Sequence, residues 1–80
     1  MITAEKIAKL TTLKALDLDR ALVTSGYSMF ERPRTAKFLG ITNSGDFCYQ
    51  FEYKDNDSGD ITAGKLFVNL DEAGNVVAEY

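Results

Sequence analysis

The spacing of apolar residues changes character at about Tyr27. Before it, residues 3–25 are rich in Ala, Leu, Lys and Glu and contain no Gly or Pro, a composition typical of helix. After it, residues 47–53 (FCYQFEY) alternate strictly between aromatic and other side chains, which is the period of a β-strand. The pattern therefore predicts a helical segment followed by a sheet.

The helical segment carries its own start and stop signals. Thr3 suits an N-cap, and Gly26 suits the residue that follows a last helical turn. Apolar residues as far as Leu16 are spaced by three and drift around the helix, whereas Leu18 begins a new apolar face. Asp17 could cap a second helix at that point. We therefore predict a break near residue 16, and the sequence leaves open whether the segment is one helix or two.

Four strands are predicted, at residues 34–42, 47–53, 61–70 and 76–80, and short turn-rich segments join them. The registers that keep apolar side chains on one face follow from closing each turn. They pair Lys37 with Glu52, Phe38 with Phe51 and Gly40 with Tyr49, then Phe47 with Val68, Tyr49 with Leu66 and Phe51 with Gly64, then Leu70 with Val76, Val68 with Ala78 and Leu66 with Tyr80.

All three hairpins share one apolar face, which the helical segment must cover. Its members are Ala36, Phe38, Phe47, Tyr49, Phe51, Tyr53, Leu66, Val68, Leu70, Val76, Ala78 and Tyr80. The prediction is a single α+β domain, residues 1–80, with an N-terminal helical segment packed on one face of a four-stranded antiparallel meander. This arrangement resembles that of cystatins and monellin. The resemblance concerns arrangement alone, so it implies no function.

Composition places the chain among soluble globular domains. Of its 80 residues 45% are hydrophobic and 26% charged, and no apolar run approaches the length of a membrane span. The first ten residues lack the apolar stretch of a signal peptide, and the single Cys48 excludes an intrachain disulfide. We therefore expect a cytoplasmic protein without a membrane partner.

The sequence offers little for catalysis or metal binding. Histidine is absent, which removes Ser–His and Cys–His pairs and every His-ligated metal site. Residues 54–60 (KDNDSGD) look like a calcium loop, but only Asp55 and Asp57 match ligand positions, and Leu66 stands where a glutamate is required. This stretch is interpreted as a hairpin turn. We expect no enzyme activity, no cofactor and no metal site.

The net charge of −3 conceals an uneven distribution. Residues 1–40 carry seven Lys/Arg and four Asp/Glu, whereas residues 41–80 carry two and eight. A small basic cluster, Arg32, Arg34 and Lys37, makes a nucleic-acid-binding protein one alternative. The absence of positive charge over a whole face disfavours that alternative.

The registers leave a second group of apolar residues on the opposite face of the sheet. The group contains Leu39, Ile41, Cys48, Phe67 and Val77, and its rim contains Lys37, Gln50, Glu52, Lys65 and Glu79. An apolar patch with a polar rim is typical of a protein contact, unless the broken helical segment wraps over it. We therefore predict a small non-catalytic interaction protein, an inhibitor, adaptor or regulatory subunit. Its partner would be another protein or a second copy in a homodimer. A small-ligand carrier with a pocket between helix and sheet is a further alternative.

Overall fold

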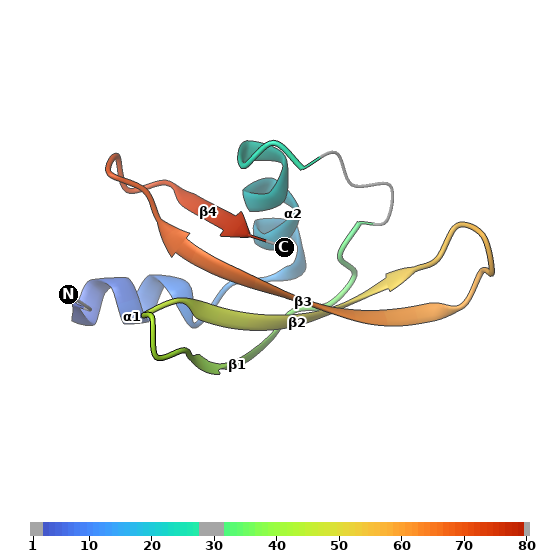
Figure 1. The fold of residues 1–80 in the computed structure, drawn as a ribbon, viewed down its shortest axis with the longest axis horizontal. Coiled ribbons are helices and arrows are strands. Elements are labelled where there is room, and N and C mark those ends of the chain that lie inside the picture. Colours follow the sequence, from blue (N-terminus) through green and yellow to red (C-terminus); the bar gives the residue numbers. More distant parts are fainter. Residues whose placement is uncertain (1–2, 28–31, 80) are drawn as a thin grey trace.

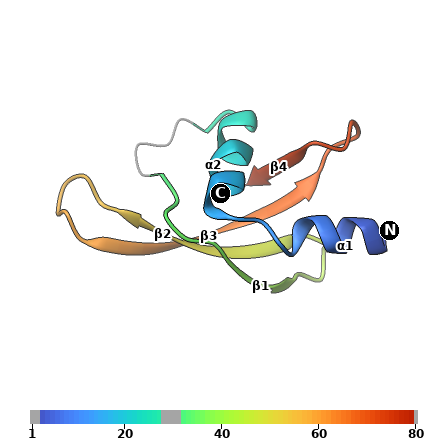
Figure 2. The ribbon, with the colours of Figure 1, turned by 180° about the vertical axis from the view of Figure 1, so that it is seen from behind.

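A computed structural model of the chain describes residues 3–27 and 32–79. Its elements, in chain order, are α1 (Ala4–Leu10), α2 (Ala15–Thr24), β1 (Lys37–Ile41), β2 (Phe47–Lys54), β3 (Ile61–Leu70) and β4 (Val76–Glu79). The strands form one antiparallel sheet in the order β1-β2-β3-β4. Both helices lie on one side of this sheet, behind the strands in Figure 1 and in front of them in Figure 2. The predicted α+β architecture is confirmed.

The N-terminal segment is two helices separated by residues 11–14. Thr3 caps α1 as predicted, because its hydroxyl accepts the N–H of Lys6 at 3.1 Å. The break comes earlier than predicted. The hydroxyls of Thr11 and Thr12 donate to the carbonyl oxygens four residues before them, at 2.7 and 3.0 Å. The Ile7 carbonyl also accepts the N–H of Thr11, at 3.0 Å, so the two hydroxyls add side-chain bonds to the carbonyls of the last turn.

Helix α2 begins after Lys14 and ends before Gly26. Asp17 is not its cap: it lies in the first turn, where its carboxylate accepts the N–H of Lys14 at 2.8 Å. An acid in this place still stabilises the start of a helix. Gly26 has the predicted role, with φ of 90°, and the N–H groups of Gly26 and Tyr27 donate to carbonyls of the last turn at 3.1 and 2.9 Å. This double bond pattern is a Schellman ending.

The second and third hairpins have the predicted registers. Strands β2 and β3 pair Phe47 with Val68, Tyr49 with Leu66 and Phe51 with Gly64, and strands β3 and β4 pair Val68 with Ala78 and Leu70 with Val76. The predicted pairing of Leu66 with Tyr80 lies outside the described residues. The acidic stretch 54–60 is the turn of the β2–β3 hairpin, in which the Asp55 carboxylate accepts the N–H groups of Asp57 and Ser58.

The predicted register of the first hairpin is wrong. It places Lys37 opposite Gln50, Phe38 opposite Tyr49, Gly40 opposite Cys48 and Ile41 opposite Phe47, with an irregularity between Phe38 and Gly40. The turn closes between Thr42 and Asp46, whose N–H and C=O groups bond at 2.8 Å, and not around Ser44 and Gly45 alone. Leu39 is the extra residue of a bulge in β1, which shifts the pairing once more.

The core fills the space between the helices and the sheet. Its members are all less than one-tenth exposed: Leu10, Leu18, Ala21, Leu22, Phe47, Tyr49, Phe51, Leu66, Val68 and Ala78. Ala36, Phe38, Tyr53, Leu70 and Val76 pack against them while half-buried. The face that the sequence predicts for the core is thus the face that the helices cover.

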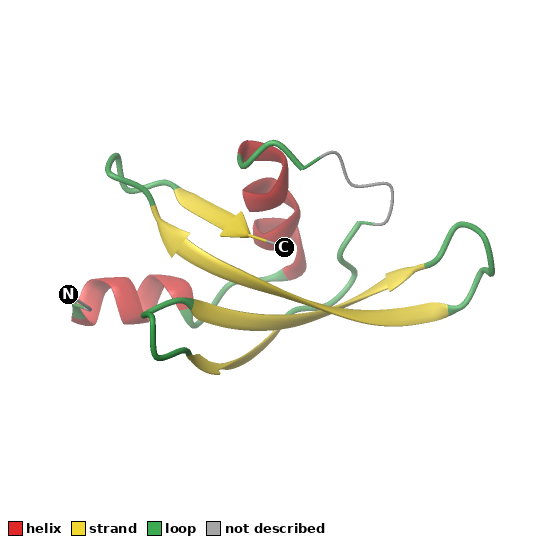
Figure 3. Ribbon diagram, viewed as in Figure 1, coloured by secondary structure: helices red, strands yellow, loops and turns green. Residues whose placement is uncertain are grey.

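The molecule is elongated, with principal dimensions of 41 × 22 × 19 Å. At one end of the long axis lies α1, and at the other the β2–β3 hairpin continues beyond both helices to the loop at residues 55–60 (Figure 1 and Figure 3). This projecting part has a short backbone contact on one side, where the N–H of Arg34 donates to the carbonyl of Glu52 at 2.7 Å. The sheet therefore extends past the core that stabilises it.

Candidate functional site

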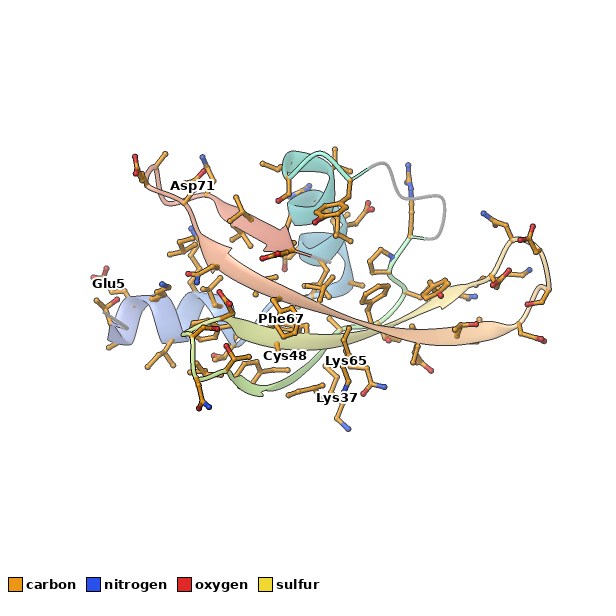
Figure 4. The ribbon with its side chains drawn as sticks, viewed as in Figure 1. Glu5, Lys37, Cys48, Lys65, Phe67 and Asp71 are labelled. Atoms are coloured by element: carbon orange, nitrogen blue, oxygen red, sulfur yellow. The ribbon has the colours of Figure 1, made fainter. Side chains whose placement is uncertain are left out.

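The side of the sheet that faces away from the helices is called the outer face here. At its centre, Phe67 on β3 stands directly opposite Cys48 on β2. Figure 4 shows the two side chains together, on the side of the sheet turned toward the viewer. Phe67 is 37% exposed and Cys48 is half-buried with a free thiol. Across the other strand, Phe67 faces Glu79 of β4.

Val77 is the third member of the predicted patch that the structure keeps near Phe67. It stands on β4 opposite Asn69, one step along the sheet from Phe67. The two apolar side chains line a hollow of about 340 Å³ whose other walls are Ser25, Tyr27, Asp46, Asn69, Ala78 and Glu79. An aromatic side chain beside a shallow hollow with a polar rim offers both an apolar contact and hydrogen-bonding groups.

The remaining two members, Leu39 and Ile41, are placed differently from the prediction. Both are exposed, at 42% and 41%. Leu39 occupies the bulge of β1, whereas Ile41 stands opposite Phe47. Residues directly opposite one another share a face, so this pairing puts Ile41 on the side of the core, at the margin of the sheet. The predicted patch is therefore smaller, with Phe67, Cys48 and Val77 as its centre.

Two lysines on the outer face lie closer together than the predicted registers place them. Gln50 has Lys65 opposite it on one side and Lys37 opposite it on the other. Figure 4 shows both lysines projecting from the same part of the sheet, next to Cys48 and Phe67. The predicted register pairs Lys37 with Glu52 and therefore does not place it in the same row as Lys65. The register of β1 therefore creates a row of two ammonium groups beside the apolar centre.

The basic cluster predicted as a nucleic-acid contact shares its surface with an acid. Arg32, Arg34 and Lys37 are all exposed. Glu52 is fixed among them, because its carboxylate accepts the Thr35 hydroxyl at 3.3 Å and its N–H donates to the same hydroxyl at 3.1 Å. A hollow of about 500 Å³ is lined by Arg34, Thr35, Glu52 and Ile61. A phosphate backbone at this place would meet the Glu52 carboxylate as well as the cations.

A third hollow bears on the alternative of a small-ligand carrier. It measures about 450 Å³ and is lined by Lys9, Thr12, Leu13, Asp17, Arg20, Ala21, Thr24, Asn75 and Val76. The Lys9 ammonium reaches across to the carbonyl of Gly74 at 2.9 Å and ties α1 to the β3–β4 turn. This hollow lies at the margin between the helices and β4, whereas core side chains fill the centre of the helix–sheet interface.

Two titratable groups have displaced pKa values with structural causes. Burial raises the pKa of Tyr49, whose hydroxyl donates to the Leu10 carbonyl at 2.6 Å and accepts the Leu13 N–H at 3.0 Å. The backbone N–H of Asn75 is the main cause that lowers the pKa of Asp71. Within residues 3–27 and 32–79, no group of three or more His, Cys, Asp or Glu side chains could hold a metal ion. No helix in those ranges is both long and apolar enough to cross a membrane.

Comparisons of the chain with protein-family models, with curated proteins and with solved structures find no match. An exposed aromatic side chain, a neighbouring thiol and a row of two cations are groups that bind protein surfaces through apolar contact and charge pairing.

Proposed function

We propose that this protein is a small non-catalytic interaction module, of inhibitor, adaptor or regulatory type, that binds a protein partner through its outer face. The partner is another protein or a second copy of the chain. The observation that carries the proposal is the exposure of Phe67 on a sheet face that neither helix covers. Antiparallel sheets with one open face normally show polar side chains there.

The chemistry around Phe67 supports the same proposal. Aromatic residues at the centre of a patch, with charged residues at its rim, are the usual composition of an interface. Here Phe67, Cys48 and Val77 form the centre, and Lys65 and Glu79 stand beside it. The rim is mixed in charge, which favours a specific partner over general adhesion. We also place the protein in the cytoplasm, supported by the free thiol of Cys48.

The decisive experiment compares two apolar-to-acidic variants. Phe67→Glu places a carboxylate at the centre of the outer face, and Leu16→Glu places one on α2, where Leu16 is 60% exposed. Each of the two variants and the natural chain is immobilised on a resin and incubated with a lysate of the native host. The retained proteins are quantified by mass spectrometry. We expect Phe67→Glu to lose the partner that the natural chain and Leu16→Glu both retain.

Self-association is measured in parallel, by sedimentation equilibrium of the three proteins. If the partner is a second copy, the natural chain and Leu16→Glu dimerise and Phe67→Glu stays monomeric. Circular dichroism verifies that both variants remain folded. Equal behaviour of the two variants in both assays would contradict the proposal, because it would show that the outer face is not the binding surface.

A further inference from the structure

The projecting part of the β2–β3 hairpin has an unpaired backbone edge. The hairpin closes with the N–H of Asp55 bonded to the carbonyl of Asp60 at 2.8 Å. In an antiparallel pair, every second residue exchanges backbone hydrogen bonds with its partner strand. Counting from this closing pair, Thr62 and Gly64 bond to β2. The residues of β3 that alternate with Thr62 and Gly64 must therefore point their N–H and C=O groups away from β2.

Those outward residues are Ile61, Ala63 and Lys65, and all three are exposed. Along β3, the next residue of the same phase is Phe67, which pairs with Glu79 on β4. Glu79 is the last described residue of β4, so among the described residues nothing pairs with β3 on this side before Phe67. Figures 1 and 2 both show this edge of β3 without a described helix or strand beside it. Three N–H and three C=O groups are thus directed to a side of β3 on which no described strand pairs with them.

The outward edges of the two outermost strands, β1 and β4, are protected. On β4, the N–H of Ala78 donates to the Ser25 hydroxyl at 2.8 Å, so the end of α2 occupies that edge. On β1, the bulge at Leu39 interrupts the regular spacing of backbone groups. Bulges and covering elements are the usual means by which proteins prevent strand addition. The edge of β3 from Ile61 to Lys65 has neither.

The side chains along this edge indicate the chemistry of an added strand. A strand antiparallel to β3 would place one residue opposite Lys65, one opposite Ala63 two positions later, and one opposite Ile61 two positions after that. Opposite Lys65 a carboxylate fits best, since Lys37 lies in the same row beyond Gln50. Opposite Ile61, which is 53% exposed, an apolar side chain fits best.

The same edge of a second copy does not meet these requirements. If β3 pairs with β3 of another copy through the same outward groups, Lys65 faces Ile61, Ala63 or Lys65 of that copy. None of these is acidic, and one register sets two lysines against each other. Lys65 therefore works against self-pairing while accepting an acidic strand from elsewhere.

We propose that the edge Ile61–Lys65 of β3 binds an extended peptide segment of a partner protein by strand addition, with an acidic residue opposite Lys65 and an apolar residue opposite Ile61. Strand addition to an open edge is an established form of peptide recognition, in which the main chain supplies affinity and alternate side chains supply specificity. The proposal goes beyond the interaction at the outer face, because it uses the backbone edge of the sheet and not the patch around Phe67.

The test is a selection of displayed random linear peptides on the immobilised full chain and on three variants. The natural chain should select peptides with Asp or Glu four positions before a β-branched or aromatic residue. Lys65→Glu should bind these peptides roughly fivefold more weakly and select Lys or Arg at the first position instead. Ala63→Pro, which removes an outward N–H that no strand uses, should lose at least about tenfold in affinity.

Phe67→Glu is the third variant, and it should retain the selected peptides. This variant separates the two proposals. Binding at the outer face can fail while peptide binding at the edge of β3 survives, and peptide binding at the edge can fail while binding at the outer face survives. Amide hydrogen exchange gives an independent readout: Ile61, Ala63 and Lys65 should exchange faster than Thr62 and Gly64 in the free protein, and become protected by the peptide. The proposal would be overturned if no consensus sequence is selected. It would also be overturned if Lys65→Glu changes neither the affinity for the selected peptides nor the charge selected at the first position, and this holds even if Ala63→Pro fails to fold.

Discussion

Tyr49 is the residue that connects the break between the helices to the sheet. It is 1% exposed, and its hydroxyl bridges the last carbonyl of α1, that of Leu10, and the N–H of Leu13. These two groups stand at the end of α1 and in the residues 11–14 that separate α1 from α2, where the helical hydrogen-bond pattern is interrupted. A buried hydroxyl with two partners is therefore what allows a non-helical turn to sit against the core.

Replacement of Tyr49 by Phe should destabilise the protein by about 1–3 kcal/mol, since it leaves two backbone groups without their partner in a largely buried place. The free energy of unfolding is measured by urea denaturation. Tyr53→Phe is the matched control, because Tyr53 is half-buried and the structure shows no hydrogen bond from its hydroxyl to the described residues. An equal loss of stability in the two variants would contradict the bridging role of Tyr49.

At the scale of elements, the hairpins differ in how firmly their registers are fixed. The second and third were predictable, because Tyr49, Leu66 and Val68 must all face the helices and a one-residue slip would expose them. The first was not. Phe38 faces the core whether it pairs with Tyr49 or with Phe51, so the turn between Thr42 and Asp46 and the bulge at Leu39 decide the register.

The part of the candidate site in the second hairpin was therefore predictable, and the part in the first hairpin was not. Phe67 and Cys48 were predicted as neighbours because both lie in the second hairpin. The new position of Ile41 follows from the closing of the first turn between Thr42 and Asp46, and the pairing of Lys37 with Gln50 depends also on the bulge at Leu39, so neither was predictable from the apolar pattern. Apolar periodicity identifies which side chains share a face, but it does not reveal where a short edge strand gains a residue.

The β3–β4 turn supplies a prediction of pH dependence. The Asp71 carboxylate accepts the N–H of Asn75 at 2.8 Å and that of Ala73 at 2.9 Å, and the first of these is the main cause of its lowered pKa. A carboxyl whose pKa is lower in the folded than in the unfolded state stabilises the fold above its unfolded pKa. That contribution disappears as the pH falls through the folded pKa.

Asp71→Asn keeps one acceptor oxygen for the N–H groups of Ala73 and Asn75, removes the charge, and replaces the second oxygen, which accepts the Asn75 side-chain amide, with an NH₂ group. We expect the variant to melt at a lower temperature than the natural chain at pH 7. The difference should shrink as the pH falls below about 4, the usual pKa of an aspartate in an unfolded chain, and should disappear below the lowered pKa of the folded carboxyl. Thermal melts followed by circular dichroism from pH 7 to about 2 measure it. A difference that stays constant over this range would show that the charge does not stabilise the turn.

At the scale of the whole molecule, the two helices both pack against the same side of the sheet. Their apolar residues Leu10, Leu18 and Leu22 are fully buried against the strands. The described helices therefore leave the outer face open, with Phe67 in its middle and Lys37 and Lys65 beside it. We propose that this open face is the surface through which the protein binds its partner.

Site-specific photocrosslinking tests this claim most directly. Benzoylphenylalanine is introduced in native host cells in place of Gln50, between the two lysines, or in place of Leu16 on the exposed side of α2. We predict a discrete crosslinked adduct from position 50 and none from position 16, and the mass of the adduct distinguishes a second copy from another protein. A discrete adduct from position 16 with none from position 50 would contradict the claim.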